Sequence, residues 1–325
     1  MEYRRLGRSG LKVSALSLGS WLTFGKQISD ETAEELMVTA YDLGINFFDN
    51  AEIYARGQSE IVMGNILKKL EWRRDTYLVS SKVFWGGDKP NQTGLSRKHV
   101  FEACHAALKR FQLDYLDLYF CHRPDPETPI EETVWVMNDL IRQGKILYWG
   151  TSEWSAQEIT EAHAVARREH LIPPTMEQPQ YNLFHRRRFE LEYSRVFSEL
   201  GYGSTIWSPL ASGILSGKYN NGFPDDTRLG MQGLDWLREK VHTDENLNKT
   251  RALSYLADEM GISLPCLAIA WCLKNPHVST VILGASKKQH LVENIQSLEV
   301  LPMLSPEVLS RIEEIVNNQP KADGF

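Results

Sequence analysis

Short apolar segments alternate with longer, periodic segments along this chain. The short segments have four or five residues, the length of buried strands, whereas the longer ones repeat apolar residues with the period of amphipathic helices. The predicted strands are residues 15–18, 45–48, 77–80, 116–120, 146–149, 175–178, 203–207 and 278–282. The sixth is poor in apolar residues and is placed by its position in the cycle. A helical pattern follows each strand, so the chain predicts eight strand-then-helix units.

Capping residues mark several of the predicted helix ends. Gly44 follows the first long helical pattern, in the place of a C′ glycine. Ser155 and Glu158 have the spacing of a capping box, and Thr128 and Glu131 have the same spacing around a proline suited to the first helical turn. These residues predict defined helix starts and stops.

Eight units without a break in composition predict one α/β domain over residues 1–325, folded as a (β/α)8 TIM barrel, with a tail from about residue 318. An open doubly wound sheet is the alternative. Such a sheet often carries G-x-G-x-x-G after a strand, but Gly19 lacks that spacing, and Gly201 and Gly203 lie before a strand. The barrel is therefore the more economical prediction.

A long connection follows the seventh predicted strand. It runs from Ser208 to Glu245 and is rich in glycine, whereas connections in such folds usually have ~2 to 6 residues. A loop of this length predicts a functional role. A last helix, which starts at Ser305, is expected to cover the end of the fold.

The composition of the chain excludes several classes of function. The chain has 325 residues, of which 42% are hydrophobic and 24% charged, so its core can hold the fold without metal or disulfide. A net charge of -6 argues against nucleic-acid binding, and the absence of H-E-x-x-H and similar spacings predicts no metal site. No apolar stretch reaches the ~20 residues of a membrane span. The four cysteines lie in apolar segments without a C-x-x-C pair, which indicates buried thiols in a reducing compartment, and we expect a cytoplasmic protein.

Candidate chemistry lies where the predicted strands end. Asp49 directly follows the second strand, Tyr54 comes five residues later, and Lys82 and His122 follow the next two strands. In a barrel these positions meet at one rim. An ammonium beside a phenol favours the phenolate, so we expect Lys82 to lower the pKa of Tyr54, with Asp49 orienting the lysine and His122 orienting the reacting oxygen or moving its proton. The alternative is a strand-end aspartate and a core tyrosine without a chemical role.

Several separated motifs resemble one enzyme family. They are the segment from Gly44 to Tyr54, Lys82 and His122 after their strands, Gly150-Thr151-Ser152, Trp207-Ser208-Pro209-Leu210, Gly217-Lys218-Tyr219 and the segment from Ile282 to Ser286. In this order they resemble the aldo-keto reductases over nearly the whole chain. Phe84-Trp85-Gly86-Gly87 and Arg123-Pro124-Asp125-Pro126 are similar to the branch of voltage-gated potassium channel β subunits and their bacterial relatives.

This resemblance implies NADPH-dependent reduction of aldehydes or ketones to alcohols, with Tyr54 as the general acid, Asp49 and Lys82 tuning it, and His122 positioning the carbonyl. It implies a carbonyl pocket walled by Trp21, Tyr54, Phe84, Trp85 and His122. The residues implied to bind NADPH/NADP+ are Ser20, Trp21, Gln27, Asp49, Ser152, Gln178, Trp207, Ser208, Pro209, Leu210, Ser212, Lys218, Arg228, Gly284, Ser286, His290, Glu293 and Asn294. Ser286 stands at an expected helix amino terminus, where free N–H groups and the dipole favour the 2′-phosphate.

Three positions depart from the family pattern. Glu153 stands where many members place an amide, and it receives no binding role here. His290 stands where the channel branch usually has glutamine. His122 stands where mammalian channel β subunits have asparagine, which favours an enzyme over a pure sensor.

The alternative function is a cofactor-loaded regulatory subunit that docks to a membrane channel or transporter and senses redox state. The resemblance further implies a homo-oligomer, a tetrameric ring or an octamer of two such rings.

Overall fold

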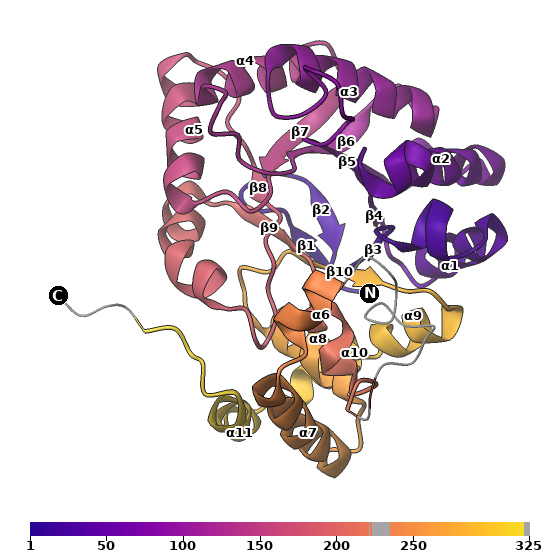
Figure 1. The fold of residues 1–325 in the computed structure, drawn as a ribbon, viewed down its shortest axis with the longest axis vertical. Coiled ribbons are helices and arrows are strands. Elements are labelled where there is room, and N and C mark those ends of the chain that lie inside the picture. The colour runs from indigo at the N-terminus through magenta and orange to yellow at the C-terminus, as the bar shows by residue number, and fades with distance from the viewer. Residues whose placement is uncertain (221, 223–234, 322–325) are drawn as a thin grey trace.

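The computed structural model describes residues 1–220, 222 and 235–321 (Figure 1). Eight parallel strands close into a barrel in the order β10-β3-β4-β5-β6-β7-β8-β9. They are β3 (Leu16–Gly19), β4 (Phe47–Asp49), β5 (Leu78–Val83), β6 (Leu116–Cys121), β7 (Ile146–Thr151), β8 (Met176–Glu177), β9 (Gly203–Ile206) and β10 (Thr280–Gly284). All eight predicted strands are confirmed within a few residues, and the closed order excludes the open sheet.

Helices surround the barrel and bury their apolar faces against it (Figure 1). They are α1 (Asp30–Asp42), α2 (Gln58–Leu70), α3 (Arg97–Phe111), α4 (Ile130–Arg142), α5 (Ala156–Arg168), α8 (Leu264–Lys274), α9 (Lys288–Ile295) and the short α10 (Ser297–Val300). After β8, two π-helical turns, η4 (Arg188–Glu192) and η5 (Val196–Leu200), take the place of a regular helix. Most of the predicted helices therefore form the outer layer of the barrel.

Further helices lie at one side of the barrel (Figure 1). Within the connection after β9, the described residues form the 3-10 helix η6 (Ala211–Ser216) and α6 (Asp235–Val241). α7 (Asp244–Glu259) follows and packs against α8 and against α11 (Pro306–Val316). Arg186 donates to the Glu313 carboxylate at 2.7 Å, which ties α11 to the segment after β8.

An amino-terminal hairpin closes one end of the barrel, and the sequence analysis missed it. Its strands β1 (Tyr3–Arg5) and β2 (Lys12–Ser14) are antiparallel and too short and polar to show a pattern. Leu6 and Val13 pack inside the barrel against Phe47, Leu118, Phe120 and Met176. The N–H of Arg8 donates to the carbonyl of Gly201 just before β9, which places the hairpin at the amino ends of the strands. Functional groups therefore have to gather at the carboxyl end.

The predicted helix caps are confirmed except at α4. Gly44 has φ 89° after α1, and Ser155 and Glu158 form the reciprocal capping box of α5. The predicted box of Thr128 and Glu131 is wrong, because α4 starts at Ile130 without a side-chain cap. The helix begins one residue later than predicted, with Pro129 at the N-cap, and the Thr128 hydroxyl donates to the Asp125 carboxylate at 2.7 Å.

The four cysteines are buried and unpaired, as predicted. Within the described chain no single helix has the length and apolar character of a membrane span; only α7 and α8 taken together do, and they are bent by 94° at their junction. No group of three His, Cys, Asp or Glu side chains that could hold a metal ion is found among the described residues.

Candidate active site

Asp49, Lys82 and Tyr54 form a contiguous polar group at the carboxyl end of the barrel. β4 ends at Asp49 and pairs with β5, which carries Lys82. The Lys82 ammonium donates to Asp49 Oδ2 at 2.6 Å and to the carbonyl of Asn50 at 2.7 Å, and its Nζ lies 3.3 Å from the Tyr54 hydroxyl. These three side chains, which their positions at strand ends predict to meet, therefore lie in contact.

The Asp49 carboxylate is saturated with donors, which fixes the lysine in place. Its second oxygen, Oδ1, accepts from the Ser80 hydroxyl at 2.8 Å and from the Gln178 amide at 3.0 Å. Lys82 is fully buried, and burial lowers its pKa while Asp49 opposes that change. Ser80 was not predicted, because a serine inside a buried strand has no sequence signal that distinguishes it from a core residue.

Tyr54 begins a short 3-10 turn, η2 (Tyr54–Gly57), in which Ala55 and Arg56 adopt left-handed backbone angles (φ 48° and 53°). Such strain is usually retained where it positions a functional group. Burial raises the pKa of Tyr54 well above 10, with a further rise from Asp49, and Arg123 opposes both. The predicted lowering of this pKa is wrong, because desolvation and the Asp49 carboxylate outweigh the lowering by Arg123. Tyr54 is therefore a neutral phenol that holds its proton at pH 7.

The His122 ring lies next to the rings of Tyr54 and Trp85. Its ring centroid lies 5.9 Å from that of Tyr54 and 5.1 Å from that of Trp85, edge-on in both cases. Burial, Lys82 and Arg123 lower the pKa of His122 well below 6.5, so the imidazole is neutral. Its buried Nδ1 has no hydrogen-bond partner within the described residues. A neutral imidazole can donate one N–H to a carbonyl oxygen without itself competing for the proton.

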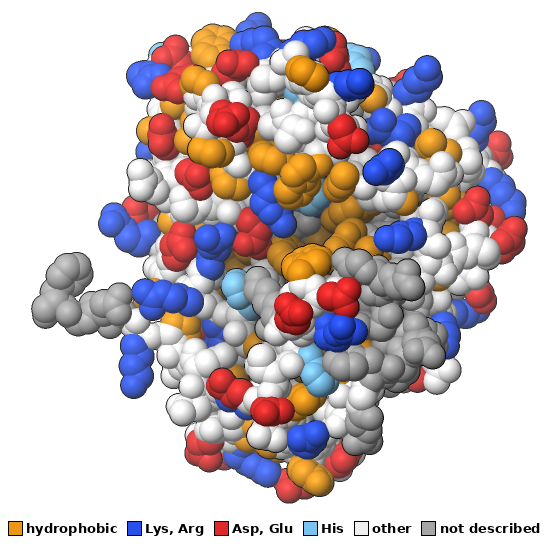
Figure 2. Space-filling model, viewed as in Figure 1, with side chains coloured by type: hydrophobic (Ala, Val, Ile, Leu, Met, Phe, Trp, Pro, Cys, Tyr) orange, Lys and Arg blue, Asp and Glu red, His pale blue; other side chains and the backbone are white. Residues whose placement is uncertain are grey.

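Phe84 and Trp85 pack against each other, and Trp85 lies beside His122. Their rings meet edge-on at 4.8 Å, and the Phe84 N–H donates to the buried Glu52 carboxylate at 2.7 Å. Trp21 lies partly exposed after β3, next to Ser20, whose hydroxyl donates to the carbonyl of Asp49 at 3.0 Å. Figure 2 shows apolar side chains gathered around a hollow in the middle of this face.

Glu153 organises three loops of the rim, although the sequence assigned it no role. Its Oε1 accepts from the Trp207 indole at 3.1 Å and from the Gln180 N–H at 2.6 Å, and its Oε2 pairs with Arg188 at 3.0 Å. Ser152 lies beside it and donates to the carbonyl of Gln178 at 2.8 Å. Ser152 is thus bonded to Gln178, whose amide donates to Asp49, whereas the Trp207 indole is bonded to Glu153.

The segment after β9 is a tightly turned loop with several left-handed residues. Ser208, Ala211 and Ser212 have positive φ (57°, 46° and 60°), and Gly213 follows at 97°. The N–H groups of Ala211 and Gly213 donate to the carbonyls of Ser208 and Leu210 at 3.0 and 2.8 Å, which holds these turns within the segment. The Ser212 N–H donates to Ser208 Oγ at 2.9 Å, which closes the loop.

The remaining predicted cofactor residues lie around the same rim on neighbouring strands. β9 pairs with β10 and β10 with β3. These residues are Pro209, Leu210 and Lys218 after β9, Gly284 at the end of β10, Ser286 after β10, His290, Glu293 and Asn294 on α9, and Gln27 after β3. α9 begins at Lys288, two residues after Ser286, so Ser286 precedes the helix rather than starting it. Arg228 lies outside the described residues.

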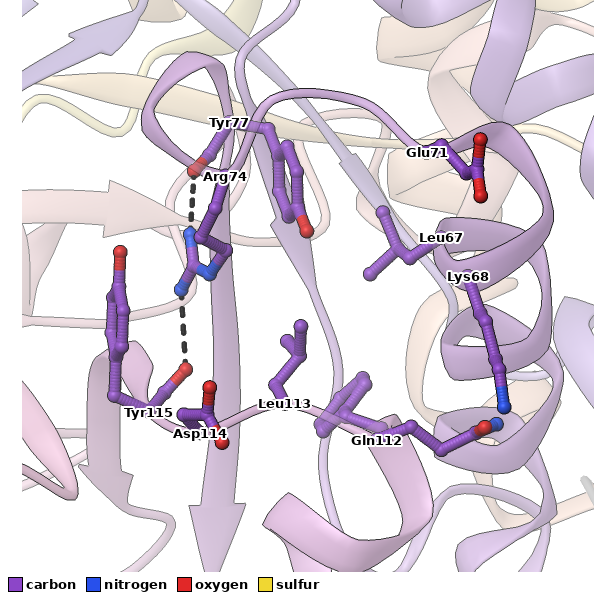
Figure 3. Close-up of a pocket in the computed structure, with 10 residues that line it drawn as sticks. Leu67, Lys68, Glu71, Arg74, Tyr77, Gln112, Leu113, Asp114 and Tyr115 are labelled. Atoms are coloured by element: carbon purple, nitrogen blue, oxygen red, sulfur yellow. Dashed lines mark hydrogen bonds between the residues drawn. The ribbon is translucent and has the colours of Figure 1, made fainter.

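A pocket of about 350 Å³ lies away from this site (Figure 3). It is lined by Leu67, Tyr77 and Leu113, among others, near the starts of β5 and β6. Arg74 at its edge donates to the Asp117 carboxylate at 2.6 Å and to the carbonyl of Tyr115 at 3.1 Å. These bonds tie the amino ends of β5 and β6 together. The pocket therefore lies at the end of the strands opposite to the candidate site and is not part of it.

Comparison with known proteins agrees with this geometry. The Aldo/keto reductase family model matches residues 15–317. A relative from Oryza sativa subsp. japonica, named "Probable voltage-gated potassium channel subunit beta", is 51% identical over 322 residues, which cover 99% of this chain and 98% of the relative. A relative of the same name from Arabidopsis thaliana is 49% identical over the same coverage.

Proposed function

The chain belongs to the aldo/keto reductase family, and from this premise we propose that it reduces aldehydes or ketones to alcohols with NADPH. The observation that carries the proposal is the contact of a buried, carboxylate-anchored ammonium with the phenol of Tyr54. The family supports an oxidoreductase, and this contact supports a proton donor at the reacting centre.

The residues at the rim fit a nicotinamide dinucleotide. We assign its diphosphate to the tightly turned loop from Ser208 to Ser212, and its nicotinamide end to Ser152, Gln178 and the Trp207 ring at the neighbouring strand ends. When bound, the reduced nicotinamide supplies the hydride. The lysines before and at the start of α9 suit the 2′-phosphate, which favours NADPH over NADH.

The protein's own residues handle the proton and the carbonyl. Tyr54 keeps its proton because burial disfavours the phenolate, and it donates that proton as negative charge develops on the substrate oxygen. Lys82 lies close enough to stabilise the phenolate left behind. Neutral His122 orients the carbonyl oxygen, and Phe84 and Trp85 exclude water from one side.

A panel of aldehydes and ketones tests this function. Wild-type protein is mixed with NADPH or NADH and each carbonyl compound, and the oxidation of the dinucleotide and the alcohol product are measured. The proposal expects multiple turnovers with NADPH and aldehydes. Absence of turnover with every compound and both dinucleotides would refute it.

The names of the two relatives favour a second candidate, a cofactor-loaded subunit of a membrane channel. In that case the nucleotide stays bound through purification, turnover is very slow, and the protein co-purifies with a channel. Rapid turnover by the isolated protein counts against it. We propose the enzyme first, because His122 can act on a carbonyl.

A homo-oligomer of four or eight chains and a cytoplasmic location belong to the same proposal. The buried, unpaired cysteines support a reducing compartment. Mass determination in solution tests the oligomer, since a monomer at all concentrations would exclude it.

A further inference from the structure

Arg123 follows His122 at the carboxyl end of β6 and borders the carbonyl site. Its guanidinium carbon lies 5.4 Å from the centre of the Trp85 ring. One nitrogen, Nη1, donates to the carbonyl of His122 and lies 3.4 Å from the Ser152 hydroxyl. The side chain is thus held between the Trp85 ring and the group predicted to bind the nicotinamide.

Arg123 is exceptional among the buried and half-buried arginines that the structure describes, because it lacks a carboxylate partner. The other six arginines of this kind have one within 4 Å. They are Arg4, Arg74, Arg110, Arg186, Arg188 and Arg238. Removing a cation from water without a counter-ion is costly, so an unpaired one is retained where a ligand supplies the opposite charge.

The free edge of the guanidinium has the geometry of a carboxylate site. Nε and Nη2 make no hydrogen bond to any described residue, and these two nitrogens form one of the two edges that pair with both oxygens of a carboxylate. Arg123 also acts on the reacting groups, because its charge lowers the pKa of both Tyr54 and His122. The cation therefore faces the centre where a bound carbonyl reacts.

We propose that Arg123 binds a carboxylate on the substrate, so that the preferred substrates are aldehydes or ketones that carry a second, carboxylate group. This inference rests on the proposed function and adds the substrate class to it. The guanidinium lies over the Trp85 ring and Nη1 donates to the main-chain carbonyl of His122, so we assign the carboxylate to the Nε–Nη2 edge.

Two aldehydes of matched size test the proposal. 4-Carboxybenzaldehyde carries the charge, and its methyl ester, methyl 4-formylbenzoate, lacks it. We expect wild-type protein to show the higher kcat/KM with the acid, chiefly through KM, and this preference to weaken as salt is added. In Arg123→Gln the acid-to-ester ratio of kcat/KM falls about 10- to 100-fold, as expected for a charge-assisted pair. Arg123→Lys keeps the positive charge but lacks the paired N–H donors of the guanidinium, so it should recover part of the acid-to-ester ratio of kcat/KM.

Arg195→Gln is the matched control, since Arg195 is 83% exposed and pairs with Glu199. It should keep the wild-type ratio. The proposal would be overturned if Arg123→Gln lowered kcat/KM equally for the acid and the ester, or if the wild type preferred the ester. Should Arg123→Gln fail to fold, inhibition of the wild type decides: benzoate must compete with the aldehyde better than benzamide does. If NADPH is oxidised with neither aldehyde, the proposed function itself is refuted. If NADPH is oxidised equally well with the acid and the ester, only the role of Arg123 is refuted.

Discussion

Lys82 is the central residue of the site, because its ammonium contacts both Asp49 and Tyr54. It is fully buried, and its charge is balanced by Asp49 at 2.6 Å while it contacts Tyr54 at 3.3 Å. A buried pair of this kind adds little net stability, but removing one partner leaves an uncompensated charge. The pair therefore contributes mainly by fixing the position of the ammonium.

Lys82→Met should abolish reduction and lower the free energy of unfolding by about 3 to 5 kcal/mol, because Asp49 is left buried without its partner. The double variant Asp49→Asn with Lys82→Met should regain much of that stability but no activity. Urea unfolding and NADPH oxidation measure the two effects. Lys69→Met is the control, since Lys69 is 67% exposed in its pair with Glu34 and should cost no more than about 1 kcal/mol. Equal stability losses in both lysine variants would contradict the account.

Glu177 predicts a pH dependence of stability. Burial raises its pKa to about 8, and its Oε1 has no partner within the described residues. The unfolded chain loses this proton near pH 4.3 whereas the folded chain keeps it to about 8, so this group costs stability progressively as the pH rises through that window.

Glu177→Gln should therefore gain stability relative to wild type as the pH is raised from 5 to 8. Melting temperatures across this range measure the effect. Glu239→Gln, on an exposed position of α6, is the control and should follow the wild type. A constant difference between Glu177→Gln and wild type at all pH values would show that the folded carboxyl is ionised throughout.

At the scale of elements, three loops converge on Glu153. Its carboxylate joins the ends of β7, β8 and β9 through Trp207, Gln180 and Arg188. Glu153 itself has φ 59°, a strained value that positions the side chain at the rim. A charged residue in a loop gave no sequence signal for this role, because its three partners are brought together only by barrel closure.

Glu153→Ala should weaken NADPH binding by about tenfold, because the indole of Trp207 loses its hydrogen bond and its fixed orientation. Glu153→Gln keeps an acceptor oxygen and should retain most of the affinity. Titration with NADPH, followed by quenching of tryptophan fluorescence, gives both dissociation constants. If the alanine and glutamine variants bind equally well, Glu153 does not position Trp207.

An element could be predicted when the residues that determine it lie within the same short segment of the sequence. Strands such as β6 are runs of buried residues and were predicted nearly to the residue. The β1–β2 hairpin was missed because its strands have three residues and little apolar pattern. The cap at Thr128 was wrong, since α4 begins one residue later than predicted and the Thr128 hydroxyl donates to Asp125, outside the capping motif.

At the scale of the whole molecule, the two ends of the barrel are separated in role. The hairpin fills the amino end with Leu6 and Val13, and the polar group of Asp49, Tyr54 and Lys82 lies at the other end. Eight strand-then-helix units predicted this barrel, and strand-end residues predicted the site. The sign of the pKa change at Tyr54 and the unpaired charge of Arg123 could not be predicted, since both depend on burial and on contacts between distant segments.

Leu6→Ala should lower the free energy of unfolding by about 2 to 5 kcal/mol, because it opens a cavity in the closed amino end. NADPH affinity should stay unchanged, since the site lies at the opposite end. Urea unfolding and NADPH titration measure the two quantities. Met303→Ala, at a 44% exposed position, is the control for stability. A parallel loss of cofactor affinity in Leu6→Ala would contradict the separation of the two ends.

The role of Tyr54 as proton donor is tested most directly by single-turnover reduction. Wild-type protein and Tyr54→Phe are loaded with NADPH and mixed with an aldehyde, and the loss of NADPH absorbance is followed, with Tyr255→Phe (72% exposed) as the control. The account predicts a rate about 10² to 10⁴ lower in Tyr54→Phe, with NADPH binding and the melting temperature retained. Reduction by Tyr54→Phe at the wild-type rate would contradict it.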